Sequence, residues 1–425
     1  MGDGAVILRG RPQFPFAGAG IFTHGTERPP RTFPSHALKI SLVTETYPPE
    51  INGVAMTLSH LVEGLAARGH DVTVLRPRQS GSDRPTDGAP YREHLFPGMP
   101  IPGYPLLKLG LPAGDRLRRL WREERPDLVH LATEGPLGLS ALHAARALGL
   151  PVSSTFHTNF HSYSRHYGFP FLARVALAYL RYFHNRTAVT LSPTSDLNAA
   201  LERDGFRNVR LLARGVNARV FSPAHRDEAL RARFGATPDS LLVVHVSRLA
   251  AEKNYRLLFR TYDAIRAVHP SARFVVVGDG PLRRRFERRY PWCHFTGFLP
   301  RPQLAATYAS ADLFLYPSVT ETFGNVVTEA MASGLPVVAF NYAAAARYLR
   351  HEQNGYLVPL ENRDAFLLGA LQLASDSLLR QALGRAARLT AEGISWDAVI
   401  DGFERDLALV ATGPNPLLAC NPGQA

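Results

Sequence analysis

The sequence predicts an α/β protein built from two doubly wound, Rossmann-like domains in tandem. Short apolar runs typical of buried parallel strands alternate with longer amphipathic stretches, an alternation that favours βαβ units over all-α or all-β folds. The alternation begins near residue 38 and starts afresh near residue 241. A length of 425 residues also fits more than one domain, at about 150 residues per domain.

The first domain is predicted from one clear βαβ unit. The apolar run Leu38–Val43 is followed by a loop, a helix over residues 54–69 and the strand Asp71–Leu75. Two strands joined through a helix in this way pair in parallel. Further strands are predicted at Asp127–Leu131, Pro151–Phe156 and Ala188–Leu191.

The second domain repeats the pattern after a connection at Ala213–Pro223, which we interpret as the linker. A final helix is predicted around Trp396–Val410. The strands expected in this domain are Leu241–Val246, Phe274–Val277, Leu313–Tyr316 and Pro336–Phe340.

These elements divide the chain into five expected segments: a disordered extension over 1–37, domains over 38–212 and 213–394, a helix over 395–411 that returns to the first domain, and a flexible tail over 412–425. The extension lacks the compact apolar stretch of a secretory signal. The sequence contains no run of about 18 apolar residues and therefore predicts no membrane-spanning helix.

Composition narrows the class of protein. Apolar residues make up 45% and charged residues 20% of the chain, which excludes a disordered or fibrous protein for most of its length. The net charge of +12 suits nucleotide diphosphates, anionic lipid or nucleic acid without choosing among them. The two cysteines, Cys293 and Cys420, exclude a disulfide framework and a cysteine zinc site and favour a reducing compartment.

The segment Pro317–Pro336 carries the most informative pattern: a strand end, a loop with Gly324, and a helix that stops at Gly334. A helix N-terminus offers free N–H groups and partial positive charge to a phosphate. Glu321 lies in the loop and Glu329 eight positions later on the helix. Such carboxylates suit a vicinal diol, because each accepts two O–H donors.

The two glutamates form an E-x7-E pattern that resembles the signature of the retaining glycosyltransferases of family 4, also described as glycosyl transferases group 1. Other stretches agree with that family in order, and the resemblance extends over about residues 38–410. They are Tyr47–Ala55, Thr155–Thr158, Val246–Leu249 with Glu252–Asn254 behind it, and Val277–Pro281.

The resemblance implies the GT-B architecture, in which two Rossmann-like domains face an interdomain cleft, and hexosyltransferase activity with retention of anomeric configuration. The donor is a nucleotide-diphosphate sugar, with GDP-mannose preferred narrowly, and the acceptor is a lipid or a glycan. Transfer from a UDP-hexose or UDP-glucuronate to diacylglycerol is the alternative within this family, whose members include mannosyltransferases and glycolipid synthases.

Arg248 and Lys253 are the candidate groups for the departing diphosphate, since cations aimed at that group stabilise charge that grows in the transition state. A metal ion is the competing way to neutralise it. The chain contains no Asp-x-Asp motif, so we expect no metal requirement and no cofactor beyond the nucleotide-sugar co-substrate.

The resemblance also assigns roles within the donor site. Glu321 holds sugar hydroxyls, Glu329 the ribose diol, and the backbone amides of Phe323, Gly324 and Asn325 the sugar or phosphate. Gly53, which lacks a side chain, lets the first loop approach the phosphates. The stretch Gly297–Leu299, with Leu299 at its end, faces the nucleobase.

His157 corresponds to the family histidine that lines the donor sugar and stabilises the cationic anomeric centre. Two other interpretations are a structural histidine at a strand end, and a zinc site with His161 and His166, which lacks an acidic ligand close in sequence.

The chain departs from the family pattern at two places. Asn52–Gly53 stands where relatives often carry Gly-Gly, and Asn341–Arg347 replaces a Gly-Gly pair followed by glutamate. The second difference bears on the choice of sugar rather than on the class of enzyme.

Basic amphipathic stretches in the first half suggest contact with an anionic membrane surface. They lead to the expectation of a cytoplasmic enzyme, peripheral on the inner membrane face; a solvated helix face is the alternative. They are Phe171–Phe183 and the helix that carries Arg116, Arg118, Arg119, Arg122 and Arg125.

Two other classes of protein remain as alternatives. A nucleotide-sugar 2-epimerase shares the fold, although the E-x7-E pattern with Lys253 argues against it. A non-catalytic polyanion-binding protein fits the net charge, but the arginines are dispersed and no nucleic-acid module is present, so we expect no nucleic-acid partner.

Overall fold

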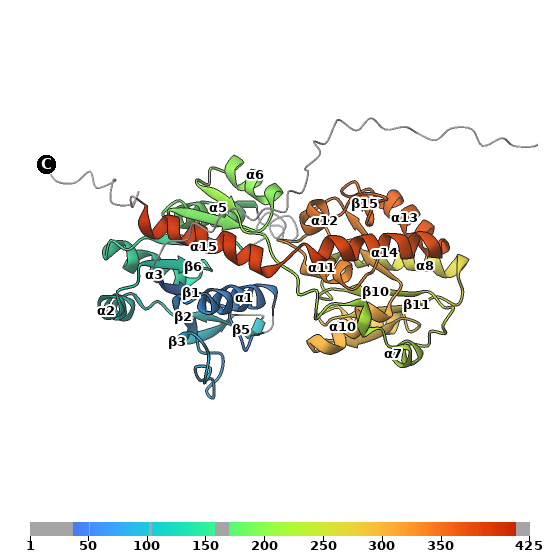
Figure 1. Ribbon diagram of the computed structural model, residues 1–425, viewed down its shortest axis with the longest axis horizontal. Helices are drawn as coiled ribbons and strands as arrows, with labels where there is room; N and C mark the ends of the chain where they lie inside the picture. Colours follow the sequence, from blue (N-terminus) through green and yellow to red (C-terminus); the bar gives the residue numbers. More distant parts are fainter. Residues whose placement is uncertain (1–36, 51, 102–103, 158–169, 414–425) are drawn as a thin grey trace, which may run out of the picture. The chain divides into compact units, whose positions relative to one another are not determined.

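The computed structural model describes residues 37–50, 52–101, 104–157 and 170–413 (Figure 1). The predicted extension and tail lie almost entirely outside these ranges. Within them the chain forms two parallel β-sheets flanked by helices, together with one small antiparallel pair.

The first sheet has seven strands in the order β3-β2-β1-β6-β7-β8-β9, and every neighbouring pair is parallel. Its central strands are buried on both faces, which explains why they read as continuous apolar runs. The strands are β1 (Lys39–Val43), β2 (Asp71–Pro77), β3 (Arg92–Phe96), β6 (Leu128–Leu131), β7 (Val152–Thr155), β8 (Val189–Ser192) and β9 (Val209–Leu211).

Helices cover both faces of this sheet. Leu42 packs in one apolar cluster with α1 (Gly53–Ala67) and α15 (Trp396–Thr412), whereas the next residue, Val43, packs in another with α2 (Gly114–Glu124) and α3 (Pro136–Ala147). Successive strand side chains point to opposite faces, so one strand serves both layers. The remaining helices of this part are α5 (Pro170–His184) and α6 (Ser195–Arg203).

The second sheet has six strands in the order β12-β11-β10-β13-β14-β15, again all parallel. One face packs against α10, α11, α12 and α14, and the other against α8 and α13. The strands are β10 (Leu242–Val246), β11 (Arg273–Val277), β12 (His294–Gly297), β13 (Leu313–Tyr316), β14 (Val337–Phe340) and β15 (Tyr356–Val358).

The helical segments of this second part vary from single turns to sixteen residues. They are η1 (Pro223–His225), α7 (Glu228–Arg233), η2 (Ala251–Lys253), α8 (Tyr255–Val268), α9 (Arg283–Arg289), α10 (Arg301–Ser310), α11 (Asn325–Ala332), α12 (Ala343–Tyr348), α13 (Arg363–Ser375) and α14 (Ser377–Glu392).

The chain passes between the two sheets twice, and the two passages are paired. The backbone N–H of Val216 donates to the carbonyl of Ile394 at 2.9 Å. A Cβ on Gly215 would lie 2.6 Å from the backbone nitrogen of Trp396, so only glycine fits there. After this crossing α15 packs along α1 and the first sheet (Figure 1).

The prediction of an α/β fold with two doubly wound sheets is confirmed. Every predicted strand is present with its ends shifted by at most two residues, and the first helix runs over 53–67 instead of 54–69. The antiparallel pair β4 (Gly98–Ile101) and β5 (Tyr104–Gly110) was not predicted.

Candidate active site

The candidate site residues of the second part lie where its strand order reverses. In this sheet β10 lies between β11 and β13, so the strand order runs toward one edge through β11 and toward the other through β13. Open α/β sheets bind ligands beside the carboxyl ends of strands at such a switch point. Arg248 and Lys253 follow β10, while the segment from Glu321 to Asn325 follows β13.

Lys253 and Glu321 form the central contact. The Lys253 Nζ donates to Oε1 of Glu321 and, at 3.3 Å, to the carbonyl oxygen of Thr320. Both side chains are mostly covered, with 13% and 15% of their surface exposed. The structure therefore brings together two residues that lie 68 positions apart in the sequence.

Glu321 is held by two further donors. The Tyr316 hydroxyl and, at 2.9 Å, the Ser318 Oγ donate to the same Oε1. Burial and then the nearby Glu321 charge raise the pKa of Tyr316 well above its usual value, so the phenol stays a donor. Sequence reasoning missed both residues; their positions five and three before Glu321, at the strand end, are the signal that could have indicated them.

Arg248 is paired differently. Its Nη2 donates to Oε1 of Glu252, and 42% of its side chain is exposed. The Glu252 backbone carbonyl accepts from Thr320 Oγ1 at 3.0 Å, which ties this turn to the Glu321 loop. Each predicted cation thus has a carboxylate partner, and the arrangement leaves Arg248 the more accessible of the two.

The N-terminus of α11 follows directly. Phe323 is buried, Gly324 adopts a φ of +90° that favours glycine, and Asn325 begins the helix. A Cβ on Gly53, the first residue of α1, would lie 3.8 Å from Nδ2 of Asn325. The predicted Gly53 and Asn325 are therefore close together.

Glu329 lies on the next turns of α11. Its Oε2 accepts from the Tyr308 hydroxyl at 3.3 Å. Burial raises the pKa of Glu329 to about 7, and the charge of Arg301 and the Tyr308 hydrogen bond offset only part of that effect. Leu299, two residues before Arg301, packs partly buried against the apolar cluster that contains Tyr308.

His157 lies two residues beyond β7. Both of its ring nitrogens are buried and have no hydrogen-bond partner among the described residues. Burial, and after it the charge of Arg214, lower the pKa of His157 well below 6.5, so the imidazole is neutral at pH 7. His161 and His166, the other residues of the alternative zinc site, lie outside the described residues.

Family models match both halves of the chain. The model described as Glycosyltransferase Family 4 covers residues 51–220, and the model described as Glycosyl transferases group 1 covers residues 226–390. A GDP-mannose-dependent alpha-mannosyltransferase of Mycobacterium tuberculosis is 36% identical over 369 residues, which span 86% of this chain and 94% of the relative. The chain belongs to glycosyltransferase family 4.

Two other proteins extend the comparison. This glycosyltransferase is 31% identical over 309 residues to the sulfoquinovosyl transferase of Arabidopsis thaliana, covering 71% of this chain and 60% of the relative. Sucrose-phosphate synthase from Thermosynechococcus elongatus has a similar structure, with a TM-score of 0.72 and 19% identity, covering 88% of this chain and 99% of the other. The predictions of the GT-B fold and of a hexosyltransferase are confirmed.

The connection after β9 contributes a residue that sequence reasoning assigned only to the linker. Arg214 is 4% exposed and its Nη1 donates to Oδ1 of Asn325 at 3.4 Å. Its Cζ lies 5.6 Å from the ring centroid of Phe323. Nothing in the local sequence signals this position, because its hydrogen-bond partner Asn325 is 111 residues away.

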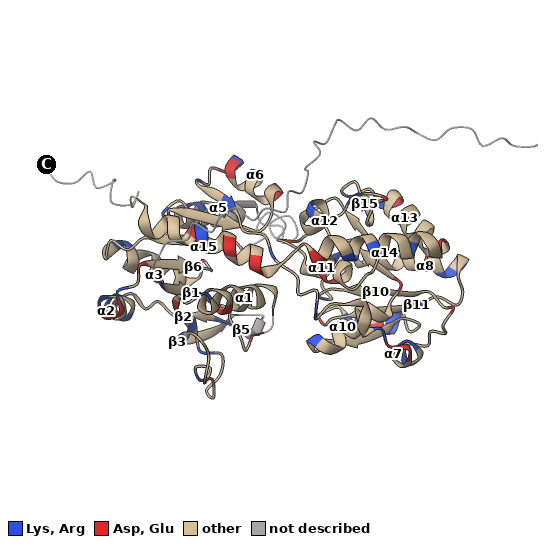
Figure 2. Cartoon of the chain, in the orientation of Figure 1, with Lys and Arg blue, Asp and Glu red and all other residues tan. Residues whose placement is uncertain are grey.

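The predicted basic helix in the first part is α2. Leu117 and Trp121 are buried in the core, and α2 carries both charges, with Asp115 before its arginines and Glu123 and Glu124 after them (Figure 2). Arg125 follows the helix in a left-handed conformation. None of the described helices combines the length and apolar character that spanning a membrane requires.

Proposed function

We propose that this glycosyltransferase moves a mannosyl group from GDP-mannose to a hydroxyl of a lipid or glycan acceptor, with retention of configuration and without a metal ion. The observation that carries the donor assignment is the similarity, over nearly the whole of both chains, to a relative named a GDP-mannose-dependent alpha-mannosyltransferase.

In the proposed reaction the bond between the sugar C1 and the β-phosphate oxygen breaks, and that oxygen keeps the electron pair. The acceptor oxygen forms the new bond to C1, and its proton passes to the departing phosphate oxygen. Lys253 and Arg248 face the charge that grows on the phosphate, where preorganised donors lower the barrier. The Lys253–Glu321 contact supports this assignment, since it places a cation beside the proposed sugar-binding carboxylate.

The other predicted residues bind the donor. Glu321, fixed by Tyr316 and Ser318, accepts from sugar hydroxyls, and Glu329 accepts from the ribose diol. The N–H groups that begin α11 bind the sugar or phosphate. A neutral His157 suits the sugar side, because a charged imidazolium would repel the positive charge that develops at C1.

Independence from a metal ion rests on these cations and on the donor set of the site. The part of the chain that the structure describes contains no group of three or more His, Cys, Asp or Glu side chains arranged to hold a metal ion. The proposal is that Arg248, Lys253 and the helix amides supply the positive charge.

The test is transfer from a panel of donors by the wild type, Lys253→Met and Lys39→Met. Lys39 is exposed at the start of β1, and the same substitution there is a matched control. We expect transfer from GDP-mannose, a loss of about 10²- to 10³-fold in kcat in Lys253→Met and no change in Lys39→Met, with equal circular dichroism spectra.

Other results would redirect the assignment. Transfer from UDP-glucose or UDP-glucuronate alone would refute the GDP-mannose proposal while leaving a glycosyltransferase. Conversion of the donor to its 2-epimer without acceptor would refute sugar transfer itself. Full activity in Lys253→Met would refute the role of this cation.

A further inference from the structure

Three arginines are buried among the described residues, and two of them follow the usual rule for a buried charge. Arg76 is 1% exposed and donates to Asp83 at 2.7 Å and to Glu93 at 2.6 Å. Buried charges are generally paired and hydrogen-bonded, because leaving water is otherwise costly.

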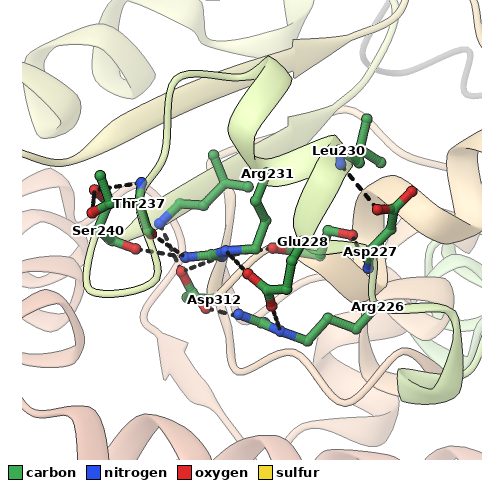
Figure 3. Close-up of polar contacts among 10 residues, drawn as sticks. Arg226, Asp227, Glu228, Leu230, Arg231, Thr237, Ser240 and Asp312 are labelled. Carbon is green, nitrogen blue, oxygen red and sulfur yellow. Dashed lines mark hydrogen bonds and ion pairs between the residues drawn. The ribbon is translucent and has the colours of Figure 1, made fainter.

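Arg231, also 1% exposed, has hydrogen-bond acceptors for its guanidinium as well (Figure 3). Its Nη1 donates to Asp312 at 2.9 Å and to the carbonyl of Ser310 at 2.7 Å, and its Nη2 donates to the carbonyl of Ser240 at 2.7 Å. The guanidinium is therefore neutralised by the protein's own groups.

Arg214 breaks this rule. Its Nη2 is buried without a hydrogen-bond partner among the described residues, and its Nη1 has only the 3.4 Å contact to the neutral Asn325. None of the ion pairs among the described residues includes Arg214, and the nearby Glu321 pairs with Lys253 instead. Burial lowers the pKa of Arg214 to about 10, with the Glu321 charge offsetting part of the effect, so it remains charged at pH 7.

Two helix N-termini beside Arg214 add positive potential around it. Gly53 and Asn325 begin α1 and α11, and a Cβ on Gly53 would lie 3.6 Å from the Arg214 Nη1. Helix N-termini carry a partial positive charge that acidic residues of the first turn usually offset. Neither α1 nor α11 has an acidic residue in its first turn.

We propose that Arg214 is a third cation of the donor site and binds the diphosphate of the nucleotide sugar, which supplies the negative charge missing around it. This inference rests on the proposed function and deepens it. Because Nη2 is covered in this arrangement, contact requires the outer part of the side chain to turn, and the absence of a side chain at Gly53 leaves room on that side.

The proposal predicts a pattern that a structural arginine would not produce. Replacing a charge that lacks a partner by an apolar chain of similar length costs little stability and often adds some. Arg214→Met is therefore expected to melt at the same temperature as the wild type or higher, whereas Arg231→Met, its matched buried control, is expected to melt lower.

Calorimetry with GDP and with guanosine tests the binding role. We expect Arg214→Met to bind GDP about 10- to 100-fold more weakly, the range of one or two charge-assisted hydrogen bonds, and to bind guanosine like the wild type. Arg214→Lys should recover part of the GDP affinity because the charge is kept. Arg231→Met, where folded, should bind GDP like the wild type.

Wild-type GDP affinity in Arg214→Met would overturn the inference and leave the proposed function standing. The inference would also be overturned if Arg214→Met melted as low as Arg231→Met and Arg214→Lys recovered no GDP affinity, since that pattern indicates a structural role. If the wild type binds neither GDP nor UDP, the proposed function fails and inorganic pyrophosphate becomes the probe. Pyrophosphate that stabilises the wild type but not Arg214→Met supports the anion site, and equal shifts overturn it.

Discussion

We expect Glu329, as a proposed donor-binding residue, to make donor binding dependent on pH. Its pKa of about 7 arises mainly from burial, and the proposed role requires the ionised form, which accepts both ribose hydroxyls. With that pKa, the ionised fraction is about one tenth at pH 6 and about nine tenths at pH 8. We expect the affinity for GDP-mannose to rise about tenfold over this range and to level off above it.

The same shift acts on stability with the opposite sign. An unfolded glutamate has the ordinary pKa of 4.5, so the folded chain holds this proton more tightly than the unfolded chain. The free energy of unfolding therefore falls as pH rises from 4.5 to 7, by on the order of 3 kcal/mol from this group. Glu329→Gln removes the effect and is expected to be the more stable protein at pH 8.

Calorimetric titration with GDP-mannose from pH 6 to pH 8 measures the effect. GDP-mannose is preferable to GDP, whose terminal phosphate titrates with a pKa of about 6. Burial lowers the pKa values of His157 and His245 below this range. Protonation of these two histidines therefore adds no pH dependence to the measured affinity. Glu329→Gln should bind weakly at every pH, and Tyr308→Phe, which removes a donor to the carboxylate, should shift the rise to higher pH.

A wild-type Kd that is constant across this range contradicts the argument. The argument is also contradicted if Glu329→Gln shows the same pH dependence of GDP-mannose affinity as the wild type, because another titrating group would then be responsible.

Three further outcomes are expected. Transfer should proceed at the same initial rate in excess EDTA, and a loss that Mg²⁺ or Mn²⁺ restores would refute independence from metal. In urea titration, Gly278→Ala should lower the free energy of unfolding by about 2 kcal/mol or more. The reason is that φ of Gly278 is +128° and an added Cβ would lie 2.0 Å from the Ser247 carbonyl oxygen. The control Gly81→Ala should leave the free energy of unfolding unchanged, because its added Cβ would have no atom within 4 Å. Replacing the exposed Arg119 and Arg122 of α2 by Glu should reduce co-sedimentation with anionic vesicles, and unchanged binding would refute the membrane contact predicted from the sequence.

Strands could be predicted from the sequence where their own residues form a continuous apolar run. The runs at β1, β10 and β13 are buried on both faces, so they stand out as continuous apolar segments. The strand β9 has three residues and a half-exposed pattern, and β4 contains Pro100, so neither carries such a signal. These strands depend on pairing with neighbours that the local sequence does not reveal.

The same distinction applies to the site. Glu321, Gly324 and Glu329 lie on one loop and helix, so their pattern, together with the family resemblance, predicts donor binding from the sequence. Arg214 is a lone arginine in a connection, and its role follows only from contacts with Asn325 and Gly53, which the fold brings close to it. Residues that act through long-range proximity therefore escape pattern reasoning even when the motifs around them are recognised.

The balance of charge at the site links these observations to the choice of donor. Arg248 and Lys253 are each neutralised by a carboxylate, Glu252 and Glu321, whereas Arg214 has no such partner within the described part of the chain. Of these three cations, Arg214 is therefore the one whose charge is not balanced by an ion pair with a described residue, and it lies beside the first residues of α1 and α11. In the proposed binding mode, a diphosphate brings negative charge to Arg214 without displacing either carboxylate, so Glu321 remains available to hold the sugar. A monophosphate ester offers fewer oxygens for the same three cations, which gives the site a physical reason to prefer nucleotide-diphosphate sugars over sugar monophosphates.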